Sequence, residues 1–198
     1  MQRYHFCEID LAAIRHNVGV MKSHIAGGAR FLAVVKADAY GHGAVPVAKA
    51  ALEAGADMLA VAIPEEGIEL REAGIAAPIL VLGGIEESAA EAVVQNDLTQ
   101  VGFDERRIRA LAQAGQKLGR CARVHLKLDT GMNRIGVRTA EEAQALTRLI
   151  DSLPGVALTG CFTHMATADE PDPTGTLRQI ERFEALCKAV QAGHPGEI

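Results

Sequence analysis

The 198-residue sequence has no tryptophan and only two tyrosines, and none of its stretches is apolar enough to cross a bilayer. Its first ten residues mix charged and apolar side chains, so they lack the apolar segment of a secretion signal. The four cysteines form no C-x-x-C pair, which argues against a disulfide framework and against a zinc site. We therefore expect a cytoplasmic protein without a metal and without a membrane partner. The cysteines, which we interpret as ordinary thiols, are Cys7, Cys121, Cys161 and Cys187.

Basic runs and nucleotide-binding motifs are also missing. The 20 Lys and Arg residues are interspersed with 25 Asp and Glu residues and give a net charge of -5, so we expect no nucleic-acid partner. The chain contains neither a G-x-x-x-x-G-K-S/T loop nor a G-x-G-x-x-G turn after a strand, which excludes the common phosphate-binding loops. With 48% hydrophobic residues, the chain can bury one sizeable core.

Short apolar runs alternate with longer segments whose apolar residues recur at helical spacing. This alternation predicts an α/β protein with a parallel sheet. Glycines after three of the helical segments, at Gly55, Gly74 and Gly119, are typical of helix ends. The predicted strands are 31–35, 59–63, 79–82, 98–101, 122–128 and 156–162, and the predicted helices are 45–54, 65–73, 86–95, 105–118, 140–152 and 176–191.

The beginning of the chain adds a possible strand over Glu8 to Leu11 and a helix that Asp10 could cap. Leu11, Ile14, Val18 and Met21 share one face of that helix. Six strand and helix units are too few for a closed (β/α)8 barrel, whereas a doubly wound sheet needs only five or six. Both folds place their chemistry at the carboxyl ends of parallel strands, so the residues there decide between them.

The most informative strand end is residues 34–43, with the sequence V-V-K-A-D-A-Y-G-H-G. Many strand-terminal lysines only extend into solvent, which is the simplest interpretation of Lys36. A lysine that an apolar strand end desolvates is instead available as a neutral amine, which can act as a nucleophile or a base. The glycines at 41 and 43 suit places where the backbone turns sharply or approaches a ligand.

Two further strand ends carry polar clusters. Residues 125–136 fit the pattern H-x-K-x-D-T-G-M-x-R-x-G, and residues 160–170 fit G-x-x-(S/T)-H-x-A-x-A-D-E. Lys127 could simply form a strand-edge ion pair with Asp129, and a lone histidine such as His164 is usually only a hydrogen-bonded structural group. All three patterns, in this order and spacing, resemble those of the alanine racemases, and the resemblance runs from about residue 8 to residue 169.

This resemblance implies a TIM-type (β/α)8 barrel that binds pyridoxal 5'-phosphate (PLP), with roles for five residues. Lys36 would hold PLP as a Schiff base and act as one of two catalytic bases. Arg134 and His164 complete the implied catalytic set, in which Arg134 also binds the substrate carboxylate. By the same resemblance, Tyr40 contacts the cofactor phosphate, Lys127 can be a carbamate that holds Arg134, and His164 stacks on the ring. Leu82 is expected to line the pocket because it lies at a strand end.

The resemblance also implies an isomerase that interconverts L-alanine and D-alanine for peptidoglycan and works as a homodimer. Because family members are longer, we expect residues 1–198 to be an incomplete amino-terminal barrel domain of about six units, without the β-rich carboxyl-terminal domain that supplies the second base, a tyrosine. We expect these residues alone to be inactive. The alternatives are a racemase of serine or a basic amino acid, and a barrel that binds PLP without catalysis.

Overall fold

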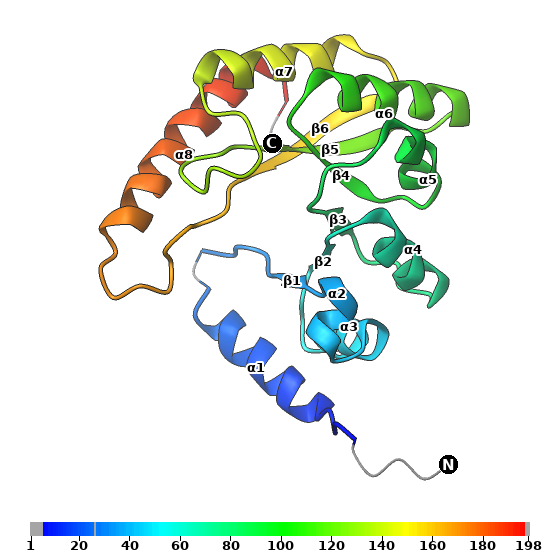
Figure 1. Cartoon of the computed structure of the whole chain (residues 1–198), viewed down its shortest axis with the longest axis vertical. Helices are drawn as coiled ribbons and strands as arrows, with labels where there is room; N and C mark the ends of the chain where they lie inside the picture. The colour runs from blue at the N-terminus through cyan, green and yellow to red at the C-terminus, as the bar shows by residue number, and fades with distance from the viewer. Residues whose placement is uncertain (1–5, 26, 197–198) are drawn as a thin grey trace. The chain divides into compact units, whose positions relative to one another are not determined.

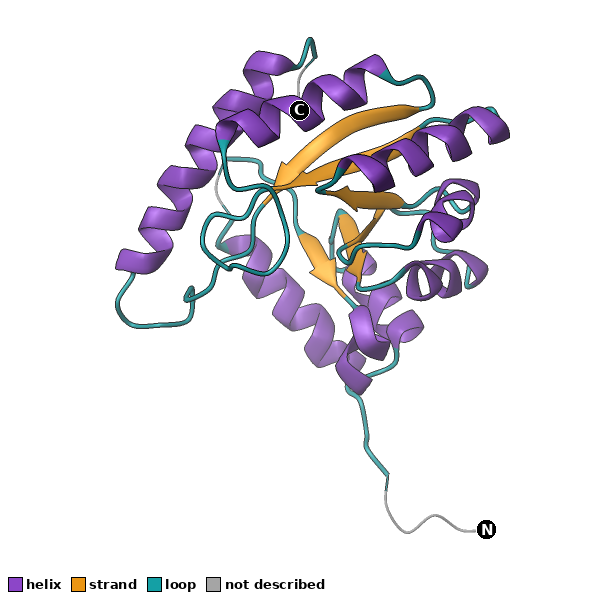
Figure 2. Cartoon of the chain, turned by 45° about the horizontal axis from the view of Figure 1, so that its top comes forward, coloured by secondary structure: helices purple, strands orange, loops and turns teal. Residues whose placement is uncertain are grey.

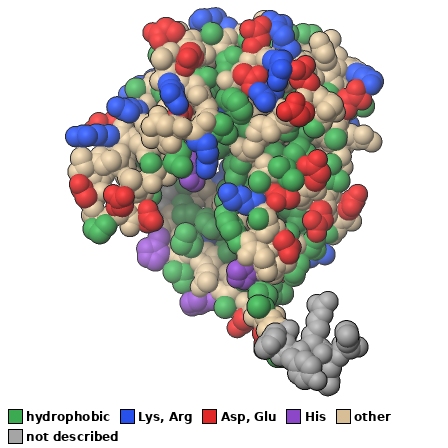
Figure 3. Space-filling model, in the orientation of Figure 1, with side chains coloured by type: hydrophobic (Ala, Val, Ile, Leu, Met, Phe, Trp, Pro, Cys, Tyr) green, Lys and Arg blue, Asp and Glu red, His purple; other side chains and the backbone are tan. Residues whose placement is uncertain are grey.

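The structure is a computed structural model that describes residues 6–25 and 27–196. The chain divides into two compact units, residues 1–83 and 84–198. In both units parallel strands alternate with helices, as Figures 1 and 2 show. No helix within the described residues combines the length and the hydropathy that a membrane span requires. On the face drawn in Figure 3, Lys and Arg side chains are interspersed with Asp and Glu side chains.

The first unit contains three parallel strands in the order β1-β2-β3, with Ala33 opposite Leu59 and Leu59 opposite Ile79. Helix α1 packs against α3 through a small core in which Val18 joins Ala51. The elements of this unit are α1 (Leu11–Ser23), β1 (Leu32–Val34), α2 (Lys36–Gly41), α3 (Ala44–Glu53), β2 (Met58–Val61), α4 (Pro64–Glu72) and β3 (Ile79–Val81).

The second unit contains three more parallel strands in the order β4-β5-β6. The pairing of β5 with β6 shifts by one residue between Val124 and His125, which is a β-bulge in β6. The elements of this unit are η1 (Glu87–Ala89), α5 (Ala90–Gln95), β4 (Thr99–Gly102), α6 (Glu105–Leu118), β5 (Ala122–Lys127), α7 (Ala140–Ser152), β6 (Val156–Phe162) and α8 (Thr174–Gly193).

The predicted elements agree closely with the structure, and the local reasons are visible. All six strands lie within two residues of their predicted ends, and α6 and α7 have the predicted bounds. Thr139 and Glu142 cap α7 reciprocally, with each side chain accepting a hydrogen bond from the other's backbone N–H. The three glycines predicted at helix ends all have positive φ, from +61° to +100°.

The beginning of the chain corrects one prediction and confirms another. Residues 8–10 form no strand, and the helix begins directly at Leu11. Asp10 is the predicted N-cap, because its carboxylate accepts hydrogen bonds from the N–H groups of Ala12 and Ala13. Of the residues predicted to share one face of this helix, Val18 is buried, whereas Met21 is 58% exposed.

Two of the four cysteines meet, although the sequence suggests separate thiols. The Sγ atoms of Cys161 on β6 and Cys187 on α8 are 3.3 Å apart. Burial and the neighbouring thiol raise the pKa of Cys161 to about 12, and burial also raises the pKa of Cys187. Both groups are therefore protonated near neutral pH and are poor nucleophiles.

A glycine in α6 sets how closely the loop before β6 approaches this helix. A Cβ atom on Gly115 would collide with the carbonyl oxygen of Gly155 and would lie 2.9 Å from that of Arg120. Because backbone oxygens cannot rotate away as side chains do, Gly115→Ala should lower the free energy of unfolding by about 3 kcal/mol in urea titrations. The control is Gly19→Ala, at a helical glycine with open space around it, which should raise that free energy by about 0.5–1 kcal/mol. Equal effects of the two changes would contradict the close approach.

Candidate functional site

Lys36 lies just beyond the carboxyl end of β1, separated from the strand by Val35. Val35 is buried and continues the pairing with β2, since its N–H donates to the carbonyl of Ala60 at 2.8 Å. Lys36 itself is half-buried, and its Nζ lies 5.9 Å from the centre of the Tyr40 ring, which is exposed. The ammonium and the aromatic ring therefore lie within the range of a cation–π contact.

The turn after Lys36 is left-handed, which the sequence did not predict. Residues 37–40 all have φ between +51° and +57°, although none of them is glycine. Gly41 and Gly43, which follow, also have positive φ, as expected for glycine. Each such residue costs about 1–2 kcal/mol in this conformation, so the surroundings must hold the turn. Asp38 does part of this, because its Oδ1 accepts a hydrogen bond from the N–H of Ala44 at 2.6 Å.

Glu66 on α4 holds the other side of the same turn. Its Oε1 accepts from the N–H of Ala37 at 2.7 Å, and its Oε2 accepts from the N–H of Ala62 at 2.6 Å and of Ile63 at 3.3 Å. One carboxylate thus ties the residue after Lys36 to the loop after β2. The available sequence signal was Pro64 at the first helical position followed by an acidic residue at the third, which is typical of a capped helix start.

A Glu66→Gln variant should weaken this attachment. The amide keeps one acceptor but turns an NH2 group towards backbone N–H donors, leaving at least one donor unpaired. We expect the free energy of unfolding to fall by about 1–3 kcal/mol in urea titrations. The matched control is Glu65→Gln, because the neighbouring Glu65 is exposed and its substitution should have no measurable effect. Equal losses in both variants would rule out a special role for the Glu66 carboxylate.

Leu82 completes the candidate residues of the first unit. It is half-buried directly after β3, and its N–H donates to the carbonyl of Val61 at 2.8 Å. Because β1, β2 and β3 are parallel, their carboxyl ends lie along one edge of the sheet. Lys36, Tyr40 and Leu82 therefore all belong to this edge.

In the second unit, Lys127 is the last residue of β5 and only 3% exposed. Its Nζ lies 3.5 Å from the carbonyl oxygen of Leu128 and 5.2 Å from the centre of the Phe162 ring. Burial is the main cause that lowers the pKa of Lys127, the positive charge of Arg134 lowers it further, and Asp129 opposes both. The environment therefore favours the neutral amine more than water does.

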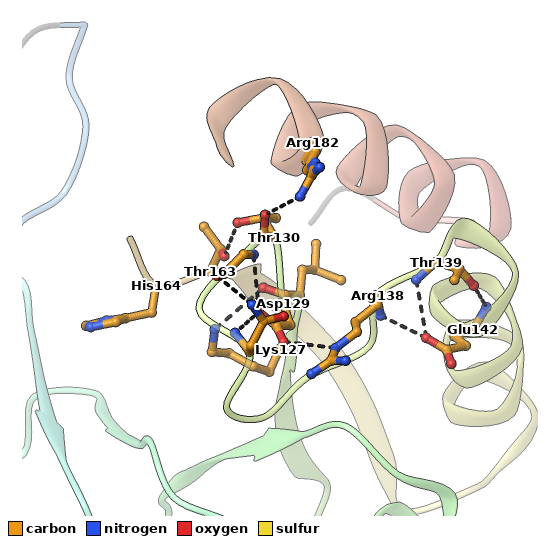
Figure 4. A network of polar contacts seen from close by, with 12 residues as sticks. Lys127, Asp129, Thr130, Arg138, Thr139, Glu142, Thr163, His164 and Arg182 are labelled. Atoms are coloured by element: carbon orange, nitrogen blue, oxygen red, sulfur yellow. Dashed lines mark hydrogen bonds and ion pairs between the residues drawn. The ribbon is translucent and has the colours of Figure 1, made fainter. Parts of the chain in front are cut away.

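The ion pair of Asp129 is with Arg138, and not with Lys127 as one interpretation of the sequence suggested. Figure 4 shows the contact between Asp129 Oδ2 and Arg138 Nε, at 3.1 Å. Asp129 also accepts from the N–H groups of Gly131 at 3.2 Å and Asn133 at 2.9 Å. Its side chain is 1% exposed, and although burial opposes ionisation, these donors outweigh it and lower the pKa of Asp129. The carboxylate thus shapes the loop that leads to Arg134.

Arg134 and His164 are both exposed, in the loops that follow β5 and β6. Arg134 makes no hydrogen bond or ion pair with any other residue that the structure describes, and its charge acts on Lys127. The guanidinium is therefore available to an anionic or carbonyl group of a ligand. In Figure 4 the His164 ring points away from the contact between Thr130 and Thr163, whose hydroxyl oxygens lie 2.8 Å apart.

Gln179, a buried amide on α8, contacts both of these loops and was not predicted from the sequence. A signal existed, because the buried residues of α8 are Gln179, Leu186 and Val190, at helical spacing. A polar residue in such a stripe needs hydrogen-bond partners. The six residues that the sequence predicted fall into two groups, with Lys36, Tyr40 and Leu82 in the first unit and Lys127, Arg134 and His164 in the second.

In each unit parallel strands alternate with helices, and functional side chains follow the carboxyl ends of the strands. This arrangement is that of an α/β protein of the barrel type. A family model described as "Alanine racemase, N-terminal domain" matches residues 9–198. The chain therefore belongs to the alanine racemase family, through its amino-terminal domain. The prediction of family and fold class from the sequence is confirmed.

Individual relatives agree with this assignment. The chain is 52% identical over 189 residues to an alanine racemase of Symbiobacterium thermophilum, covering 95% of the chain and 50% of that protein. It is 46% identical over 181 residues to alanine racemase 1 of Bacillus subtilis, covering 91% of the chain and 46% of that protein. The chain thus spans about half the length of these relatives.

Solved structures show the same likeness. The crystal structure of alanine racemase from Bacillus anthracis with bound L-Ala-P has a TM-score of 0.90 and 36% identity, and the match covers 97% of this chain and 50% of that one. The alanine racemase of Clostridium difficile 630 in complex with cycloserine has a TM-score of 0.88 and 37% identity, and the match covers 93% of this chain and 50% of that one.

Proposed function

We propose that the chain is the cofactor-binding part of an alanine racemase, in which Lys36 carries PLP and L-alanine and D-alanine are interconverted. The observation that carries the proposal is the position of Lys36, a half-buried primary amine next to the buried Val35 at the carboxyl end of β1, in a turn that Glu66 and Asp38 hold. The 52% identity to an alanine racemase over 95% of the chain supports the reaction.

The residues present fit PLP by the chemistry of their donors. The cofactor carries an aldehyde, a phenolate oxygen and a phosphate, and it needs an amine and hydrogen-bond donors. Lys36 supplies the amine, Arg134 has a guanidinium without another described partner, and the exposed hydroxyl of Tyr40 suits the phosphate. When bound, PLP supplies an electron sink that makes the α-proton of an amino acid easier to remove.

Within this proposal, each residue of the chain has one task. Lys36 Nζ holds the cofactor and then removes or returns the α-proton on one face of the substrate, which requires a neutral amine. Arg134 donates to the phenolate oxygen and to the substrate carboxylate, a planar task for a guanidinium. His164 packs against the ring, and Leu82 lines the pocket. The family resemblance suggests that a tyrosine of the carboxyl-terminal domain serves the opposite face.

Lys127 is proposed to be a carbamate, formed when the nitrogen of its neutral amine bonds to the carbon of carbon dioxide and releases a proton to solvent. Its burial and its lowered pKa support this, because only the neutral amine reacts. The resulting anion would attract the adjacent Arg134, whereas the ammonium repels it. The other parts of the proposal, namely an amino-terminal barrel domain that is completed by further chain, a homodimer, a cytoplasmic location and a supply of D-alanine for peptidoglycan, rest on the family resemblance.

The decisive experiment combines PLP attachment with racemisation in the enzyme that contains this chain. Borohydride reduction followed by peptide mapping should place the cofactor on the peptide that contains Lys36. Chiral chromatography should then show conversion of L-alanine to D-alanine, with much slower conversion of serine and lysine. Preference for serine or lysine would reassign the substrate, attachment without any conversion would identify a non-catalytic PLP-binding barrel, and absence of attachment would reject the proposal.

A further inference from the structure

Gln179 is a buried side chain whose amide connects the two loops that carry Arg134 and His164. It lies on α8 and is only 5% exposed. Its Nε2 donates to Thr130 Oγ1 at 3.0 Å, in the loop after β5, and to the carbonyl oxygen of His164 at 3.0 Å, in the loop after β6. Its Oε1 accepts from the N–H of Ala166 at 2.8 Å, in the second of these loops.

The partners of Gln179 require an amide. Gln179 uses two donors and one acceptor, and a side-chain amide offers both functions on one planar group. A carboxylate offers no donor, and an apolar side chain of the same size offers neither function. Any replacement therefore leaves buried polar groups of the two loops unpaired, which is more costly than the gain from the bond itself.

The connection continues from Thr130 towards Arg134. The Thr130 hydroxyl contacts that of Thr163 at 2.8 Å, and Arg182 of α8 donates to the Thr130 carbonyl oxygen at 3.3 Å, as Figure 4 shows. The preceding residue, Asp129, accepts from the N–H of Asn133, which is next to Arg134. A shift of the amide would therefore move both the loop before Arg134 and the backbone of His164.

We propose that Gln179 is a positioning residue that fixes the distance between the Arg134 loop and the His164 loop. This inference rests on the proposed function, in which these two side chains engage the same cofactor. The Gln179 amide forms its hydrogen bonds with residues of the two loops, and in this proposal it acts through them. Loss of its amide should leave the Arg134 and His164 side chains chemically unchanged but should shift their positions.

The first test measures loop motion and needs no cofactor. Gln179→Met keeps the length of the side chain and removes its hydrogen bonds, while Gln191→Met, at an exposed position on the same helix, is the matched control. Hydrogen–deuterium exchange should accelerate about tenfold or more in residues 129–138 and 162–168 of the first variant, while β4 and α6 stay protected. No acceleration, uniform acceleration, or the same change in the control would overturn the proposal.

The second test separates hydrogen bonding from packing. Burial raises the pKa of a carboxyl at position 179, so in Gln179→Glu the protonated acid returns and restores one donor as the pH falls. The loss of melting temperature relative to wild type should therefore shrink between pH 8 and about pH 5, whereas the loss in Gln179→Met should not depend on pH. A pH-independent loss in both variants would mean that Gln179 only fills space.

The third test addresses catalysis in the enzyme that contains this chain. Gln179→Met should lower kcat about 10- to 100-fold and weaken PLP binding to the apoprotein, because small misplacements of functional groups are costly. Local acceleration of exchange with unchanged kcat and unchanged PLP affinity would overturn the positioning role. If the wild-type enzyme neither binds PLP nor racemises alanine, the proposed function fails, and the exchange experiment still decides whether Gln179 couples the loops.

Discussion

Replacing Lys36 by alanine should abolish covalent attachment of PLP and with it all racemase activity, while leaving the fold intact. Among the six candidate residues, only Lys36 and Lys127 carry an amine, and Lys127 is buried in the second unit. Lys36 is the one that is accessible and next to the glycine-flanked turn. Lys36 is half-buried and contributes little packing. We therefore expect the free energy of unfolding to change by less than about 1 kcal/mol.

Borohydride reduction, intact mass and urea unfolding together check this prediction. The control is Lys49→Ala, because Lys49 is an exposed lysine on α3 of the same unit and its loss should affect neither attachment nor turnover. A borohydride-stable PLP adduct in the Lys36→Ala protein would contradict the assignment of this residue. Loss of the folded state in that protein would show instead that Lys36 supports the left-handed turn.

Much of the fold could be predicted from the sequence because its signals are local. A buried parallel strand is a continuous apolar run, and an amphipathic helix such as α6 repeats its apolar residues every three or four positions. The predicted strand over residues 8–11 was wrong for an equally local reason, because the Asp10 carboxylate caps the helix that starts at the next residue. The motif around Lys36 was recognisable because its residues are contiguous.

The sequence signals mark Glu66 as a helix cap and Gln179 as a buried helix residue, but they do not reveal what these side chains hold together, because their partners are distant in the sequence. Glu66 lies 29 residues from Ala37, and Gln179 lies 49 residues from Thr130. Asp129 forms its ion pair with Arg138 because the loop after β5 folds back towards α7. The spacing of charged residues in the sequence does not reveal this fold of the loop. The left-handed turn after Lys36 was missed because it contains no glycine.

In both units, one helix side chain forms hydrogen bonds to two of the loops that follow the strands. In the first unit, the Glu66 carboxylate gathers N–H groups from the turn after β1 and the loop after β2. In the second unit, the Gln179 amide gathers groups from the loops after β5 and β6. Loops at the carboxyl ends of strands carry the candidate functional residues, and a single side chain from a helix fixes two of them at once. Such support is what makes a site on loops rigid enough to orient a cofactor.

Arg134→Lys should impair turnover far more than stability in the enzyme that contains this chain. The exposed guanidinium forms no ion pair within the described residues, so its loss should change the free energy of unfolding by less than about 0.5 kcal/mol. Lysine keeps the positive charge beside Lys127 but cannot reproduce the planar fork of donors. We expect kcat/KM for L-alanine to fall about 100-fold or more, as when one donor to a developing charge is removed.

The contrast with Arg138→Lys makes the Arg134 prediction specific. Arg138 uses its Nε to bind the buried carboxylate of Asp129, at 3.1 Å. Its replacement should lower the free energy of unfolding by about 1–3 kcal/mol, because Asp129 Oδ2 loses the Nε–H donor of the guanidinium, and should reduce turnover less. Urea titrations and a chiral assay of both variants measure the two effects separately. Wild-type kcat/KM in the Arg134→Lys enzyme would show that this arginine contacts neither substrate nor cofactor. A larger loss of stability in Arg134→Lys than in Arg138→Lys would mean that Arg134 is a structural residue of the loop.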